Sequence, residues 1–209
     1  MFVGKSHFMM NFVEKSIFSY RNQIDIWLLS PTADSAQGLR NICQRRGFTF
    51  CYFNKIPDIQ DMEQNDETKH KILILEDMTY LLSIETNEYI GKLCSFLLRS
   101  RHLGISLINI LHDYKFGNKL SFQKVFLQNA SMFALFSLKN NKNAAITFLK
   151  DHMGKKAMKL IDDIFNFCIQ SSDFPYLFLD PSFTLGDNYH LSQLRTDIFN
   201  HNYVFYRDY

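Results

Sequence analysis

The chain has 209 residues, a length that suits one α/β domain better than two small ones. Its hydrophobic content of 46% and aromatic content of 15% exclude an intrinsically disordered protein, because burial of these side chains offsets the entropy lost on folding. The net charge of +2 decides nothing about nucleic acids, which bind local patches. No run approaches the roughly 18 apolar residues of a membrane span, and the first residues lack a secretory pattern. We therefore expect an intracellular protein without a membrane partner.

The first part of the chain alternates predicted helices and strands. The spacing of apolar residues predicts a helix from Ser6 to about Tyr20. Turn signals then bound two short strands with a helix between them: Ile24 to Leu29, a helix capped by Asp34 that runs to Arg46, and Phe48 to Phe53. The polar segment from Asp58 to Lys69 has no apolar period and predicts a loop or a weak helix.

The run from Lys71 to Glu76 is the predicted central strand. It contains four consecutive aliphatic residues and no Gly or Pro, which indicates a strand that is buried on both faces, as in parallel sheets. The run ends in Glu76 and Asp77. Open α/β sheets bind ligands at the carboxyl ends of their strands, so we expect the two acids to lie in a ligand crevice.

The rest of the chain continues the alternation. The predicted elements are a helix from Glu88 to Arg99, a strand from Ile105 to Leu111, a helix around Ser121 to Gln128, a strand from Met132 to Phe136, helical patterns near Asn143 to His152 and Lys155 to Ile169, and strands at Tyr176 to Leu179 and Tyr203 to Tyr206. Such alternation predicts βαβ units and a mostly parallel sheet. We predict a single α/β domain over residues 1 to 209.

Gly4, Lys5 and Ser6 are a candidate phosphate-binding segment. In a phosphate loop, backbone N–H groups and a helix start face the phosphates, a lysine reaches the terminal phosphates and a hydroxyl binds Mg2+. Gly4-Lys5-Ser6 matches only the second half of the GxxxxGK[ST] pattern. A glycine turn with a solvated lysine is the alternative. The acids at 76 and 77 follow at the interval typical of P-loop proteins and favour the phosphate site.

Glu76 and Asp77 are the candidate acids of that site. By register, Glu76 would hold Mg2+ and Asp77 would orient or deprotonate the attacking water. The order is the reverse of the usual Asp followed by Glu. The alternative is a polar strand end whose acids are solvated or cap the next segment.

The order of several motifs along the chain indicates a family. The motifs are Gly4-Lys5-Ser6, Ile72 to Met78, Arg99 to Ser106, Asn129 ahead of Phe133 to Phe136, Tyr176 to Asp180, and Leu194 to Phe199. Together they resemble the FtsK/HerA superfamily, and within it the genome-packaging ATPases of poxvirus-like viruses and of Polinton (Maverick) elements. The resemblance covers nearly the whole chain. It implies a P-loop NTPase three-layer fold whose N-terminal strand is missing or incomplete in this sequence.

The resemblance also implies a function and its partners. These ATPases use ATP and Mg2+, assemble as a ring that we expect to be hexameric, and drive double-stranded DNA into a viral capsid in the host cell. Arg101 matches the position of an arginine finger that acts on the neighbouring subunit's nucleotide, with Arg99 as the second choice. A solvated arginine at a helix end is the alternative for Arg101. His112 is at the position where the family has a polar sensor residue, usually Gln.

The sequence is also compatible with two other functions. One is a degenerate remnant that keeps the fold and a ring interface but binds no nucleotide. The other is a small P-loop kinase or NTPase outside the superfamily, which would carry an arginine-rich lid that the sequence lacks. With an incomplete phosphate loop, we expect the 209-residue chain to bind ATP weakly and to hydrolyse it little.

Overall fold

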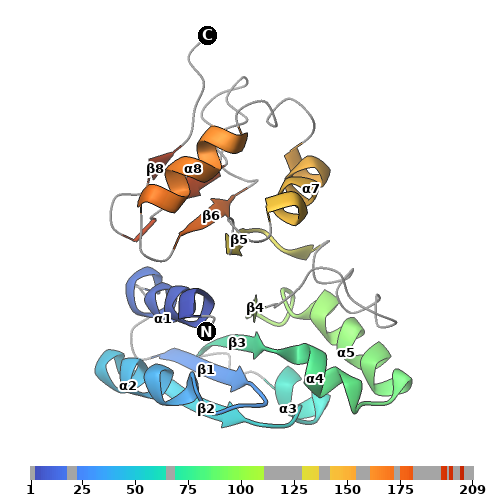
Figure 1. Cartoon of the computed structure of the whole chain (residues 1–209). Helices are drawn as coiled ribbons and strands as arrows, with labels where there is room; N and C mark the ends of the chain where they lie inside the picture. Colours follow the sequence, from blue (N-terminus) through green and yellow to red (C-terminus); the bar gives the residue numbers. More distant parts are fainter. Residues whose placement is uncertain are drawn as a thin grey trace. The chain divides into compact units, whose positions relative to one another are not determined.

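The computed structural model describes residues 3–17, 23–64, 69–110, 129–136, 142–153, 161–171, 175–180, 194–196, 198–199 and 203–204. The chain divides into two compact units (Figure 1). We call Met9–Asn129 the parallel unit, and Met1–Phe8 with Ala130–Tyr209 the antiparallel unit, after their sheets. Helix α1 (Val3–Ser16) contributes residues to both. The single domain expected over residues 1–209 stays a prediction.

The parallel unit is built on a four-stranded sheet in which all neighbours run parallel. In spatial order the strands are β2 (Thr49–Phe53), β1 (Ile24–Leu29), β3 (His70–Glu76) and β4 (Ile105–Ile110). Helices connect the strands: α2 (Ala36–Arg46), α3 (Ile59–Glu63), α4 (Met78–Ser83) and α5 (Asn87–Arg99). The predicted α/β class is therefore confirmed, and the sheet is compatible with a Rossmann-like or a P-loop fold.

Both faces of this sheet are covered, which explains the unbroken aliphatic run of β3. Successive strand residues point to opposite faces. Leu73 and Leu75 pack in one cluster with residues of α4 and α5, among them Phe96. Ile72 and Ile74 pack in a second cluster with residues of α1 and α2. Every residue of β3 from Lys71 to Glu76 is buried, as the sequence predicted for the central strand.

Helices α2 and α5 begin and end close to their predicted limits, whereas α1 is Val3–Ser16 instead of Ser6 to about Tyr20 and α4 was not predicted. Gly47 ends α2 in the left-handed conformation, at φ 72°. Ser35, and not Asp34, is the residue before α2, and its side chain forms no cap hydrogen bond. The segment predicted as a loop or weak helix contains α3, where the Asp58 carboxylate accepts from the Ile59 N–H at 3.1 Å.

Lys71 explains how the short helix α3 is held. Its ammonium donates to the backbone carbonyls of Met62, at 3.3 Å, and of Gln64, and it lies 4.2 Å from the centre of the Trp27 ring. These carbonyls end α3 and would otherwise lack donors. Burial lowers the pKa of Lys71 from its ordinary value. The lysine is at the amino ends of the strands and serves the fold there.

The antiparallel unit has a second four-stranded sheet, in the order β5 (Phe133–Phe136), β6 (Tyr176–Leu179), β7 (Leu194–Thr196) and β8 (Tyr203–Val204). Its helices are α7 (Lys142–Met153) and α8 (Ile161–Ser171). All three strand pairs are antiparallel. The mostly parallel sheet predicted for the chain thus holds for β1 to β4 but not for the later strands. The predicted helix at 121–128 lies outside the described residues.

Aromatic rings and one ion pair organise the antiparallel unit. The Phe8 ring lies 4.8 Å from Tyr176 and 5.4 Å from Phe136, centre to centre. Arg195 pairs with Asp180 at 3.6 Å, and both side chains are largely buried. This contact ties β7 to the end of β6. Among the described residues, none of the helices combines the length and the hydrophobicity of a membrane span.

Candidate functional site

Polar residues gather at the carboxyl ends of β1 and β3. Parallel neighbours end at the same edge of the sheet, so Ser30, which follows β1, and Glu76, which ends β3, belong to one edge. From β1 the chain passes to β2 on one side, and from β3 it passes to β4 on the other. Ligands in open α/β sheets bind at such a divergence, because the two connections leave a crevice between them.

Glu76 is held by a contact that the sequence did not predict. The Ser35 hydroxyl donates to Glu76 Oε2, and both residues are buried, with exposed fractions of 5% and 9%. Ser35 precedes α2 and lies 41 residues away from Glu76 in the sequence. A buried carboxylate is costly unless it accepts hydrogen bonds. Ser35 therefore stabilises Glu76 and fixes one of its oxygens.

The loop from β1 to α2 lies over this edge and is fixed at both ends. The Ser30 N–H donates to the Phe53 carbonyl at 3.0 Å, and the Tyr52 hydroxyl donates to the Ser30 carbonyl at 3.1 Å. Ser35 fixes the other end through Glu76. Between these contacts, residues 32–34 are exposed. The loop thus offers an exposed segment beside the acids.

Asp77 has a strained backbone, with φ 51° and ψ 42° in the left-handed region. Such a conformation is uncommon for residues other than Gly, although Asp and Asn adopt it more often than most, and it recurs at functional sites. Asp77 precedes α4, yet its side chain does not cap that helix. The buried strand before it and the buried Met78 after it impose the turn. The Asp77 carboxylate is half-buried and is left without a structural task among the described contacts.

Gly4, Lys5 and Ser6 lie in the first turn of α1, which begins at Val3 and not at the predicted Ser6. All three residues are half-buried. A Cβ on Gly4 would lie 3.4 Å from the Phe136 ring, so close packing alone can explain a glycine there. These residues belong to the antiparallel unit, whereas Glu76 and Asp77 belong to the parallel unit. A shared nucleotide site stays a prediction.

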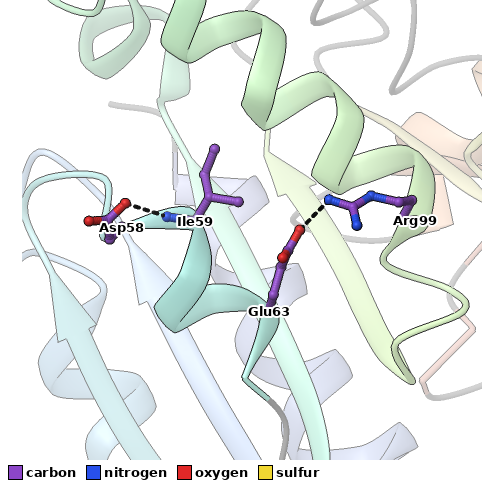
Figure 2. Close-up of polar contacts among 4 residues, drawn as sticks. All are labelled: Asp58, Ile59, Glu63 and Arg99. Atoms are coloured by element: carbon purple, nitrogen blue, oxygen red, sulfur yellow. Dashed lines mark hydrogen bonds and ion pairs between the residues drawn. The ribbon is translucent and has the colours of Figure 1, made fainter.

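The two candidate arginines lie at the opposite edge of the parallel sheet from the acids. Helix α5 returns the chain to the amino ends of the strands, where Arg101 is exposed in the turn before β4. A strand of this length is about 20 Å long, so Arg101 does not reach Glu76 or Asp77 of its own chain. Figure 2 shows Arg99, which instead forms an ion pair with Glu63 of α3. A role for Arg101 on a neighbouring subunit stays a prediction.

Two further polar residues complete the description of the strand ends. His112, the predicted sensor, lies outside the described residues. Asn109 of β4 is aligned with Leu75, and within the described chain both of its buried amide atoms lack a hydrogen-bond partner. Sequence reasoning missed it, although a polar residue inside the apolar run from Ile105 to Ile110 was a signal.

The donor set at the edge fits Mg2+ with a phosphate ligand. Among the residues that the structure describes, no three His, Cys, Asp or Glu side chains are grouped to hold a metal. Mg2+ does not need such a group, because it is usually held by one or two carboxylates together with waters and substrate phosphates. The oxygens of Glu76, Asp77 and Ser35 are donors of the preferred type. A metal here would depend on the nucleotide.

Comparisons with known proteins add no assignment. The chain matches no protein-family model, and no curated protein or solved structure is detectably similar to it.

Proposed function

We propose that this chain is an ATPase subunit of the FtsK/HerA type that moves double-stranded DNA into the capsid of a virus or virus-like transposon. The observation that carries the proposal is the position of Glu76 and Asp77, which a buried central strand delivers to the switch point of a parallel sheet. The strained backbone of Asp77 adds support, since strain of this kind is usual at functional sites. The motif order described above selects this family among proteins with P-loop folds.

Each candidate residue has one task in the proposed site. Lys5 would contact the terminal phosphates, and Ser6 and Glu76 would supply oxygen ligands to the metal. Ser35 keeps the Glu76 carboxylate in one orientation through its hydrogen bond. Asp77 accepts a hydrogen bond from the attacking water and turns that water toward the γ-phosphate. Mg2+, when bound with ATP, neutralises charge on the phosphate oxygens.

Arg101 is assigned to the neighbouring subunit's nucleotide. It is exposed, and its own acids lie at the other edge of the sheet. An arginine in that position can neutralise transition-state charge only across a subunit boundary, so the proposal requires a ring. The expected hexamer, the DNA and the capsid are partners that the proposal takes from the family resemblance.

Mg2+-dependent ATP hydrolysis tests this function. Asp77→Asn and Arg101→Ala should each keep the ATP binding of the wild-type chain and abolish its hydrolysis. Arg99→Ala is the matched control, because Arg99 is already paired with Glu63. Mixing Asp77→Asn with Arg101→Ala subunits should partly restore turnover at mixed boundaries. Equal losses for Arg99→Ala and Arg101→Ala would contradict the assignment of the finger.

A degenerate remnant without nucleotide binding is the second candidate. The contact that favours it is the hydrogen bond from Ser35, because it gives the buried Glu76 carboxylate a structural partner within the chain. Equilibrium binding of Mg2+-ATP separates the two functions. The remnant predicts no binding at millimolar nucleotide, whereas the ATPase predicts binding that Glu76→Gln weakens.

A further inference from the structure

Like the stretch from Tyr114 to Lys150, the segment from Ser35 to Pro57 carries charge of one sign only. It contains four basic residues, Arg40, Arg45, Arg46 and Lys55, and no acidic residue. The whole chain has nearly equal numbers of the two signs, 23 basic and 21 acidic. A solvated surface normally mixes the signs, so a stretch with only one sign calls for an explanation.

Helix α2 collects these charges on one exposed face. Leu39, Ile42 and Cys43 are buried against the sheet, and a Cβ on Gly38 would lie 2.6 Å from Met10 Sδ of α1. Figure 1 shows α2 beside β1 and β2 of the sheet. The exposed residues of the helix are all amides and arginines: Gln37, Arg40, Asn41, Gln44 and Arg45. They recur at helical spacing and form one continuous face, which we call the α2 face.

Among the charged residues of the α2 face, Arg40 is the one with the least evident role in the fold. Its guanidinium lies 6.0 Å from the centre of the Phe50 ring, and in the described part of the chain it pairs with no acid. At this distance the guanidinium is within reach of a cation–π contact, and such a contact leaves its N–H donors available for an anion. Arg45 and Arg46 could be explained by the helix dipole, because they are in the last turn. Arg40 lies near the middle of α2, where that effect has faded.

Arg45 is committed only weakly to its present partner. It forms an ion pair with Glu14 at 2.6 Å, with exposed side-chain fractions of 62% and 39%. Surface pairs of this kind are worth about 0 to 1 kcal/mol, so a competing phosphate can replace Glu14 at small cost. Arg40 and Arg45 together therefore present two available cations on one helix face.

We infer that the α2 face is a contact surface for the phosphate backbone of duplex DNA. Arginine, asparagine and glutamine are among the side chains that donate to phosphate oxygens, and the exposed residues of α2 include no acid. An 11-residue helix is about 16 Å long, which is enough to follow several phosphates. The choice of duplex DNA as the polyanion rests on the proposed function. The charge and the geometry of the α2 face do not depend on the proposed function.

Fluorescence anisotropy with a labelled duplex of about 30 base pairs, measured without nucleotide over a range of salt concentrations, tests this inference. Arg40→Gln and Arg45→Gln should each weaken binding by roughly fivefold to tenfold and lower the salt slope by about 1, because each removes one phosphate contact. Lys92→Gln is the matched control. Lys92 on α5 is 64% exposed and paired with Glu88, as Arg45 is paired with Glu14.

The inference is overturned if Lys92→Gln weakens binding as much as Arg45→Gln, or if the arginine variants keep the wild-type salt slope. Binding of polyglutamate as tight as that of the duplex would also overturn it, in favour of an acidic protein partner. Thermal unfolding confirms that the variants are folded. Mg2+-dependent ATP hydrolysis without DNA is measured in parallel, so that loss of the DNA surface and failure of the ATPase proposal are recognised separately.

Discussion

Asp77 combines a left-handed backbone with a carboxylate, and substitutions separate the two properties. The left-handed conformation costs an alanine about 1 to 2 kcal/mol and costs glycine little. We predict that Asp77→Ala lowers the free energy of unfolding by about 1 kcal/mol relative to Asp77→Asn, whereas Asp77→Gly does not. Denaturant unfolding measures this order. Equal stability of the Ala and Gly variants would mean that the turn at Asp77 is unstrained.

Ser35 should matter to stability more than an ordinary serine. Ser35→Ala removes a donor from a buried carboxylate, so we expect the free energy of unfolding to fall by about 1 to 3 kcal/mol. The exposed Ser83, whose hydroxyl donates to the Tyr80 carbonyl at 2.6 Å, is the control. Ser83→Ala should stay within about 0.5 kcal/mol of wild type. Similar effects of the two substitutions would contradict the role given to Ser35.

At the residue scale, the sequence reveals the acids but not their partner. Glu76 and Asp77 can be predicted as a strand end because the aliphatic run before them is local and unambiguous. Ser35 resembles any loop serine, since its partner is 41 residues away and only the parallel pairing of β1 with β3 brings the two together. A contact of that kind follows from topology and has no local signal.

Two glycines, one inside α5 and one in the turn after it, provide a paired test of local conformation. Gly104 has φ 70° in the turn after the helix, whereas Gly91 lies inside the helix with open space around an added Cβ. We predict that Gly104→Ala destabilises the protein by about 1 kcal/mol or more, and that Gly91→Ala stabilises it by about 0.5 to 1 kcal/mol. Thermal unfolding checks both signs. A stabilising Gly104→Ala would show that the turn does not require a left-handed residue.

Helix α2 carries a buried thiol that should make the protein sensitive to alkali. Burial raises the pKa of Cys43 from an ordinary value of 9.0 to about 11. The unfolded state therefore loses this proton first, and the stability it contributes is complete below about pH 9 and is lost as the pH rises to about 11. At pH 10.5 the loss is about 2 kcal/mol. Under reducing conditions, Cys43→Ala should lose correspondingly less stability between pH 8 and pH 10.5, and an equal loss would contradict the prediction.

At the element scale, hydrophobic periodicity predicted where the strands lie in the sequence better than it predicted which strands pair and in which direction. The aliphatic runs located β1, β3 and β4 and indicated a sheet that is covered on both faces. The same signal located β5 and β6 but could not show that they pair antiparallel in a second sheet. Pairing direction depends on how the connections run, and the sequence pattern does not contain that. For β7 and β8 the connection itself limits the direction, because a connection this short can join antiparallel neighbours but not parallel ones.

At the scale of the whole molecule, we propose one nucleotide-dependent function for residues of the two units. Lys5 and Ser6 belong to the antiparallel unit, and Glu76 and Asp77 belong to the parallel unit. The central proposal is that binding of one Mg2+-nucleotide complex depends on both Ser6 and Glu76. If it does, the two residues must be energetically coupled, because removal of either one disrupts the same ligand.

The most direct measurement is a double-mutant cycle on the Mg2+-dependent binding of a fluorescent ATP analogue by wild type, Ser6→Ala, Glu76→Gln and the double variant. We predict that each single substitution weakens binding by about tenfold and that the double variant is little weaker than either, because both side chains act on one ion. Independent effects that multiply to about a hundredfold, or wild-type binding that does not depend on Mg2+, would contradict the shared site.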